Sequence, residues 1–257
     1  MNINQLVKIR KKLQKRKTVI SSWSQISNPN LAEILCNKNF DCLTFDFEHG
    51  LFNISDLPNL LRVAEIKKKV TLVRLPNKNI EICRQVLDSG VDGIIIPNIS
   101  NEFELKKIID INLLPPKGKR GVGFSRSNKF GQEFNKYIKP KADPIIIAMI
   151  EDVKAIKSLN KILKVKNLDG ILIGPYDLSA SMGIPGKFKN IKFKKAINQI
   201  KTSCKNHKIS CGLHLIDPSY QKLKEYIRQG YNFIPYSTDT YIINQAVEKL
   251  FKKKASR

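Results

Sequence analysis

The sequence predicts a closed (β/α)8 barrel, of the TIM-barrel type, that forms a single domain over residues 1–257. Short apolar segments rich in β-branched residues alternate with longer segments of helical periodicity, and the alternation continues to the end of the chain. Eight segments of each kind in 257 residues match the usual size of such a barrel. No linker rich in Pro, Gly or Ser divides the chain, so a second domain is not expected.

The expected elements follow each other as strand and then helix throughout the chain. Strands are expected at residues 18–23, 42–46, 70–75, 93–97, 145–150, 170–174, 210–215 and 232–236. Helices are expected at residues 30–38, 54–66, 80–87, 102–109, 153–163, 193–205, 219–228 and 241–251. An open doubly wound sheet is the alternative, but no G-x-G-x-x-G motif follows the first strand.

The formal net charge of +24 is the strongest compositional signal, and such an excess is typical of nucleic-acid-binding proteins. The positive charge is mostly Lys and is spread along the whole chain, with no RNP-like motif and no aromatic-interleaved basic stripe. We therefore expect lysines on solvated helix faces and do not favour nucleic acid as a partner. The sequence also lacks a long apolar run and a signal-peptide pattern, so we expect a cytoplasmic protein with no membrane association.

Polar residues follow four of the expected strands, and chemistry in a (β/α)8 barrel takes place at the carboxyl ends of the strands. Asp46, Glu48 and His49 lie at the end of the second strand, and Arg74 lies at the end of the third. Glu151 follows the fifth strand and Asp177 follows the sixth. Carboxylates from two adjacent strands suit Mg²⁺ or Mn²⁺, which take one or two protein carboxylates and fill the other positions with water or substrate oxygens. The alternative is that Glu151 and Asp177 are helix caps or surface ion pairs.

One connection, residues 114–141, is longer than the others and contains several glycines. We expect it on the strand-end face of the barrel, where a long glycine-bearing loop is often functional. Its glycine spacing is not that of a Walker motif, so phosphate binding is not favoured.

Seven motifs, in unbroken order from about residue 18 to residue 251, together resemble the HpcH/HpaI aldolases. These are metal-dependent class II pyruvate aldolases that act on 4-hydroxy-2-oxo acids such as 4-hydroxy-2-oxoheptanedioate and 2-dehydro-3-deoxyglucarate. The motifs are Phe40-Asp41, Asp46-x-Glu48-His49-Gly50, Val73-Arg74-x-Pro76, Leu87-Asp88-x-Gly90, Pro116-x-Gly118-x-Arg120-Gly121-x-Gly123, Ile150-Glu151 and Ile173-Gly174-Pro175-x-Asp177-Leu178-Ser179-x-Ser181-x-Gly183.

The resemblance implies a role for each site residue. Glu151 and Asp177 would ligate Mg²⁺ or Mn²⁺, with Co²⁺ as a further candidate. His49 would be the base, oriented by Asp46, and Asp88 would reach the histidine of a neighbouring subunit. Arg74 would face the keto oxygen, the backbone around Gly174 and Tyr176 would bind the substrate carboxylate, and Met149 would stand near bound substrate. The family also implies a homo-oligomer, a hexamer built from dimers.

The implied reaction is a reversible retro-aldol cleavage of a small 2-oxo acid to pyruvate and an aldehyde. The chemistry of a lysine Schiff base is less favoured because no lysine ends an expected strand. A CoA-ester lyase of the citrate-lyase β-subunit type and a non-catalytic nucleic-acid-binding relative remain alternatives.

The chain departs from the family pattern around Ser21-Ser22, at Met149 and at Ser237, which leaves the aldehyde half of the substrate undetermined. Two further residues at strand ends have open roles. His214 ends the seventh strand and either points into the site or is a packed, hydrogen-bonded histidine. Trp23 either forms a wall of the pocket or packs in the core.

Overall fold

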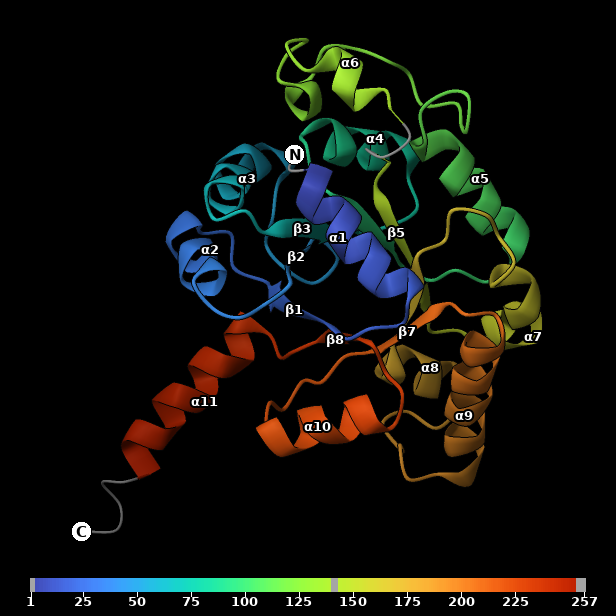
Figure 1. Cartoon of the computed structure of the whole chain (residues 1–257). Helices are drawn as coiled ribbons and strands as arrows, with labels where there is room; N and C mark the ends of the chain where they lie inside the picture. Colours follow the sequence, from blue (N-terminus) through green and yellow to red (C-terminus); the bar gives the residue numbers. More distant parts are fainter. Residues whose placement is uncertain (1–2, 140–142, 253–257) are drawn as a thin grey trace.

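A computed structural model describes residues 3–139 and 143–252. Its centre is a closed barrel of eight parallel strands, in which each strand pairs with the next and β8 pairs with β1. The strands are β1 (Val19–Ser24), β2 (Cys42–Asp46), β3 (Val70–Arg74), β4 (Gly93–Ile96), β5 (Ile145–Ile150), β6 (Gly170–Ile173), β7 (Ser210–Leu213) and β8 (Phe233–Pro235). The predicted (β/α)8 barrel is confirmed, and Figure 1 shows helices surrounding it.

The eight expected helices are all present, with ends within three residues of the expected ones. They are α2 (Pro29–Cys36), α3 (Leu57–Ile66), which follows the 3-10 turn η1 (Ile54–Asp56), α4 (Ile80–Asp88), α5 (Glu102–Asn112), α7 (Val153–Ile162), α9 (Ile191–Asn206), α10 (Tyr220–Arg228) and α11 (Asp239–Lys252). The described chain also contains three helices that the sequence reading did not anticipate, α1 (Ile3–Gln14), α6 (Phe134–Tyr137) and α8 (Pro175–Ser181).

Helix α1 covers the amino-terminal end of the barrel and crosses it in Figure 1. Its apolar residues Leu6, Ile9 and Leu13 are buried with the residues that begin several strands, such as Val19 and Ile145. Their spacing places them on one helical face, but the basic residues between them make the segment look polar. Because α1 closes this end, the barrel interior is accessible from the carboxyl ends of the strands.

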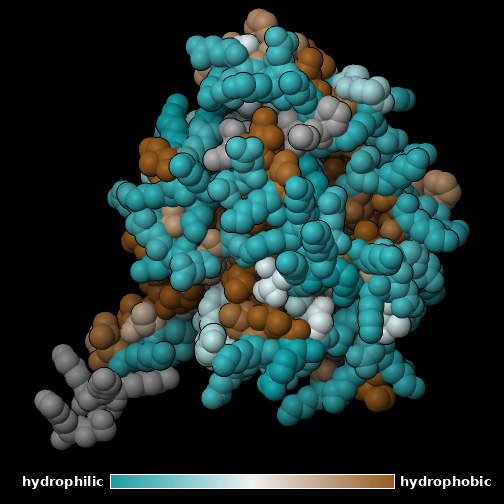
Figure 2. Space-filling view, viewed as in Figure 1, coloured by the Kyte–Doolittle hydropathy of each residue, from teal (hydrophilic) through white to brown (hydrophobic). Residues whose placement is uncertain are grey.

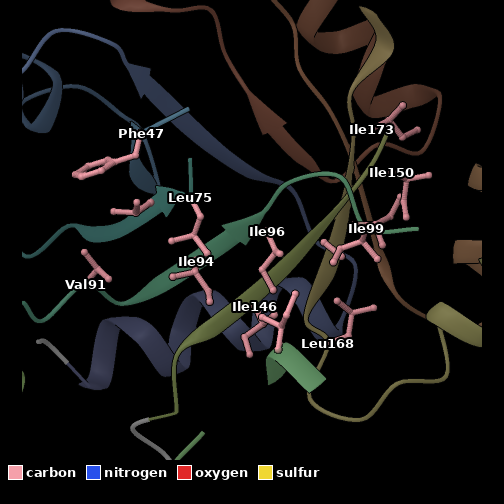
Figure 3. Close-up of a cluster of buried hydrophobic side chains, with 14 of the residues drawn as sticks. Phe47, Leu75, Val91, Ile94, Ile96, Ile99, Ile146, Ile150, Leu168 and Ile173 are labelled. Carbon is pink, nitrogen blue, oxygen red and sulfur yellow. The ribbon is translucent and has the colours of Figure 1, made fainter. Parts of the chain in front are cut away.

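The strands are buried on both faces, as parallel strands covered by helices are. Their outward side chains pack against the helices in one large cluster, part of which Figure 3 shows around Ile94, Ile96 and Ile146. Their inward side chains form a second cluster inside the barrel that includes Trp23, Met149 and Leu172. The inner cluster becomes the floor of the site described below.

The long connection from residue 114 does not lie where the sequence reading placed it. It links the end of α5 to the beginning of β5, so it belongs to the amino-terminal face of the barrel rather than to the strand-end face. There it contains η2 (Arg126–Asn128) and α6, and the Arg126 guanidinium donates to the Ser89 carbonyl just beyond α4 at 3.0 Å. Residues 140 and 141 of this connection lie outside the described residues.

Helix α11 extends away from the barrel in Figure 1. It exposes apolar side chains along its length, namely Ile242, Ile243, Val247, Leu250 and Phe251. Figure 2 shows hydrophobic side chains around this helix on a face that is otherwise largely hydrophilic. No described helix is both long and apolar enough to span a membrane.

Candidate active site

A cavity of about 290 Å³ opens at the carboxyl ends of the strands. Its floor includes Trp23, Met149 and Leu172 from the inner cluster of the barrel. Six residues that the sequence reading assigned to the site line the cavity, His49, Arg74, Met149, Gly174, Tyr176 and Asp177. The strand-end position expected for the site is therefore the position of a real cavity, as in other (β/α)8 barrels.

Asp46 and Arg74 form a buried, bidentate ion pair at the base of this site. They are directly opposite each other in the parallel register of β2 and β3, so both side chains point to the same side of the sheet. Arg74 Nε lies 2.7 Å from Asp46 Oδ1, and Arg74 Nη2 lies 2.6 Å from Oδ2. Burial alone would raise the pKa of Asp46, but hydrogen bonds and charge from Arg74 and a bond from Trp23 hold it below its ordinary value.

Asp46 positions His49 through the backbone and not through the imidazole ring. Its Oδ1 accepts the backbone N–H groups of Glu48 and His49, both at 3.2 Å. Its other oxygen accepts Trp23 Nε1–H at 3.1 Å and the Gln25 side-chain amide at 3.2 Å. The carboxylate is fully used by these contacts and by Arg74, so it fixes the turn that carries His49 while the ring remains at the cavity wall.

Arg74 also pairs with Glu48, whose Oε2 lies 2.9 Å from Arg74 Nη1. The guanidinium carbon lies 5.1 Å from the centroid of the Trp23 ring, within cation–π range. Held by two carboxylates and one aromatic ring, the guanidinium is fixed in orientation before any ligand binds. Glu48 had no expected role, although its position directly before His49 in the strand-end motif points to the site.

Glu151 is a buried carboxyl with little room around it. Its Oε1 accepts the backbone N–H of Asn98 at 2.5 Å, and its side chain is next to Gly174, where an added Cβ would lie 2.5 Å from Oε2. The pKa of Glu151 is raised to about 7, mainly by burial and also by the negative charges of Glu48 and Asp177, while the Asn98 hydrogen bond and the charge of Arg74 act against this rise. A side chain at position 174 would displace this carboxyl, so the Glu151 side chain explains why the motif has a glycine there.

Glu48, Glu151 and Asp177 lie close enough to repel one another. Burial raises the pKa of Glu48 most and Asp177 adds to it, and Glu48 and Asp177 both add to the effect of burial on the pKa of Glu151. Among the described residues, no group of three or more His, Cys, Asp or Glu side chains is arranged to hold a metal on its own. A cation at Glu151 and Asp177 would need oxygens from water or substrate to complete its coordination, as Mg²⁺ commonly does.

Asp88 does not join these residues. It ends α4, at the amino-terminal face of the barrel, and its Oδ1 lies 2.5 Å from Nη2 of the buried Arg120. The Arg120 guanidinium carbon lies 5.7 Å from the centroid of the Tyr137 ring. Asp88 is thus held by its own chain on the far side from His49, so any role in catalysis requires the site of another subunit.

The cavity also contains polar residues from the last two strands and β1 that carried no assigned role. They are Gln25, His214 and Thr238. The ring centroid of His214 lies 4.8 Å from that of Trp23, and His214 Nε2 lies 3.2 Å from the Ser237 carbonyl oxygen. His214 is therefore both packed and at the site. Ser237 has a φ of 64°, in the left-handed region that favours glycine. The backbone at this position therefore suits the glycine that is usual in the family, which Ser237 replaces.

A (β/α)8 barrel that gathers an arginine, a histidine and several carboxylates at its strand ends has the architecture of an enzyme for a small anionic substrate. The model of the HpcH/HpaI aldolase/citrate lyase family matches residues 20–246, and the chain belongs to this family.

Similar proteins agree with this assignment. The 5-keto-4-deoxy-D-glucarate aldolase of Citrobacter koseri is 29% identical over 250 residues, which are 96% of each chain. An HpcH/HpaI aldolase/citrate lyase family protein from Burkholderia cenocepacia has a TM-score of 0.90 at 21% identity, covering 96% of this chain and 99% of the other. An HpcH/HpaI aldolase from Desulfitobacterium hafniense has a TM-score of 0.88 at 24% identity, covering 95% of each chain. The solved structures support the fold, and the family and its curated relatives identify a carbon–carbon lyase of the aldolase type.

Proposed function

We propose that the protein is a divalent-metal-dependent aldolase that reversibly cleaves a 4-hydroxy-2-oxo acid to pyruvate and an aldehyde. The observation that carries the proposal is the cluster of Glu48, Glu151 and Asp177 around a fixed Arg74. It adjoins a cavity of about 290 Å³ that is lined by Arg74, Asp177 and His49. This volume suits a small acid.

The donor set fits a hard divalent cation, and we assign Glu151 and Asp177 as its protein ligands. Carboxylate oxygens are the ligands that Mg²⁺ and Mn²⁺ prefer, and Co²⁺ is a third candidate. Burial raises the pKa of Glu151 most, and the negative charges of Glu48 and Asp177 add to it; a bound cation would favour the ionised carboxylate against both effects. When bound, the cation would polarise the substrate keto group and stabilise the enolate that cleavage produces.

Arg74 contributes a fixed positive charge to the same event. Its guanidinium is held by Asp46 and Glu48 and lines the cavity, so it can stabilise the negative charge that develops on the 2-oxygen as the C3–C4 bond breaks. Because the orientation exists before substrate binds, no reorganisation is needed during the reaction. Asp46 therefore acts as a positioning residue for both Arg74 and the turn that carries His49.

His49 is the base of the proposed reaction. It accepts the proton of the 4-hydroxyl, directly or through a water molecule, while the C3–C4 electron pair passes to the pyruvate enolate. Protonation of the enolate at C3 then yields pyruvate. The substrate carboxylate binds the backbone around Gly174 and Tyr176, where the first-turn amides of α8 have no partner within the helix.

We propose that the active protein is a homo-oligomer, a hexamer built from dimers in which Asp88 approaches His49 of a neighbouring subunit. Asp88 is held away from the site of its own chain, so a second copy is the arrangement that gives it a role. The apolar side chains exposed on α11 support contacts between copies, because such surface is usually covered in an assembly.

The proposal is tested by pyruvate release from a panel of 4-hydroxy-2-oxo acids, including 5-keto-4-deoxy-D-glucarate, with and without Mg²⁺, Mn²⁺ or Co²⁺. We expect pyruvate from at least one acid in the presence of an ion. Arg74→Lys should lower turnover by about 100-fold or more, because a single ammonium replaces neither the bidentate pair nor the oriented charge. Arg84→Lys, on the exposed side of α4, is the matched control and should leave turnover unchanged. No pyruvate from any acid with any ion would contradict the proposal.

A further inference from the structure

The proposed function assigns the residues around Arg74, Glu151 and Asp177 to the pyruvate half of the substrate. These residues come from β3, β5 and the segment after β6. The rest of the cavity wall is supplied by residues at or after the ends of β7, β8 and β1, which include His214, Ile216, Thr238 and Gln25. The aldehyde half must therefore lie against this second wall.

Two of the three polar side chains in this wall are already occupied within the protein. The Gln25 amide donates to Asp46 at 3.2 Å, and its oxygen accepts the Thr240 hydroxyl at 2.7 Å. The Thr238 hydroxyl lies 3.0 Å from the Thr240 hydroxyl and accepts the Tyr241 backbone N–H at 3.1 Å. Both groups are therefore oriented by bonds within the chain and keep only part of their hydrogen-bonding capacity for a ligand.

His214 differs from them because one ring nitrogen remains available. The partner of Nε2 is a carbonyl oxygen, which can only accept, so Nε2 carries the hydrogen. In a neutral ring Nδ1 is then a bare acceptor, and no group in the described part of the chain donates to it. Burial lowers the pKa of His214 to about 4, so the ring is neutral at pH 7. Packing on Trp23 fixes the ring plane.

We propose that His214 is a specificity-determining residue whose Nδ1 accepts a hydrogen bond from a hydroxyl on the aldehyde half of the substrate. This inference rests on the proposed aldolase function. The substrates it favours are 4-hydroxy-2-oxo acids with a further hydroxyl beyond C4, and the aldehydes are those with a hydroxyl beside the carbonyl. A site built to bond a hydroxyl discriminates strongly against the analogue that lacks it, because the buried acceptor is then left unpaired.

The test uses two aldehydes of nearly equal shape, glycolaldehyde and propanal, in the synthetic direction with pyruvate. In both reactions pyruvate loses a C3 proton, its C3 bonds to the aldehyde carbon, and the aldehyde oxygen takes up a proton. For the wild-type protein we expect kcat/KM to favour glycolaldehyde by about 10-fold or more. His214→Leu should abolish this preference while changing kcat/KM for propanal by no more than about 3-fold.

His214→Asn is the matched variant, because its side chain retains an acceptor close to the position of Nδ1, and it should keep part of the preference. Exchange of the C3 protons of pyruvate in D₂O, without any aldehyde, separates the two hypotheses. Equal exchange in the wild type and both variants shows that folding and the pyruvate half are intact. Without exchange in the wild type, the proposed function itself fails. Normal exchange with no preference for glycolaldehyde, or with equal losses for both aldehydes in His214→Leu, overturns the role of His214.

Discussion

The buried carboxyl of Glu151 predicts an unusual stabilising substitution. Its pKa is raised to about 7 from an ordinary value of 4.5, mainly by burial and then by Glu48 and Asp177. Below pH 4.5 the carboxyl is protonated in the folded and unfolded states, so it has no effect on stability. Between pH 4.5 and 7 the unfolded state loses this proton first, and the free energy of unfolding falls as pH rises.

The size of this loss follows from the rise of the pKa from 4.5 to about 7, at 1.36 kcal/mol for each pH unit, and is about 3 kcal/mol above pH 7. Glu151→Gln removes the ionisation but keeps an oxygen that can accept the Asn98 N–H. We therefore expect the metal-free variant to match the wild type near pH 5 and to exceed it at pH 8 by up to about 3 kcal/mol. For a chain of this size, that corresponds to roughly 6 to 12 °C in Tm.

The assay is thermal unfolding of chelator-treated protein from pH 5 to pH 8.5. Glu133→Gln is the control, since Lys129 and Lys136 lower the pKa of this surface carboxyl and its loss should change stability by no more than about 0.5 kcal/mol. A Glu151→Gln variant that is less stable than the wild type at pH 8 would refute the reasoning, because it would show that the ionised carboxylate is stabilising without a cation.

Three other substitutions probe the base, the subunit contact and the second wall of the cavity. His49→Ala should lower turnover by about 10² to 10⁴ with metal affinity nearly unchanged, and near wild-type turnover would remove His49 as the base. Asp88→Asn should also lower activity, and mixing Asp88→Asn chains with His49→Ala chains should restore part of it; no recovery in verified mixed oligomers would argue against a shared site. His214 stays neutral when folded, so stability should fall as pH drops from 6.5 towards 4, and His214→Asn should lose less over that range in thermal unfolding.

The sequence predicted the barrel well because its strands carry strong local signals. The run Ile145–Ile150, for instance, is apolar at every position, as a parallel strand buried on both faces requires. The amino-terminal helix was missed for the opposite reason, since Lys8, Arg10, Lys11 and Lys12 obscure three apolar positions that become buried only when they meet the end of the barrel. Local patterns predict a strand or helix whose own residues show that it is buried. They fail for an element such as the amino-terminal helix, which is recognised only by the distant part of the chain that it packs against.

The same distinction applies to the site. The strand-end motifs identified six of the residues that line the cavity, but not how the site residues pair. Asp46 was expected to orient His49. The register of β2 and β3 also places it opposite Arg74, which bonds both of its oxygens, and Asp46 reaches His49 through the backbone N–H. Likewise, the ion pair of Asp88 with Arg120 depends on how a long connection packs against α4, and no spacing in the sequence encodes this contact.

Metal dependence is the central claim, and a titration of chelator-treated protein tests it most directly. Pyruvate formation and Tm would be followed together as Mg²⁺ or Mn²⁺ is added to the wild type and to Asp177→Asn. We expect wild-type activity to be absent without an ion and to rise with occupancy, together with Tm, because an ion that binds only the folded state stabilises it. Asp177→Asn should need far more ion for either response while folding normally. Full activity of the rigorously metal-free wild type would contradict the account.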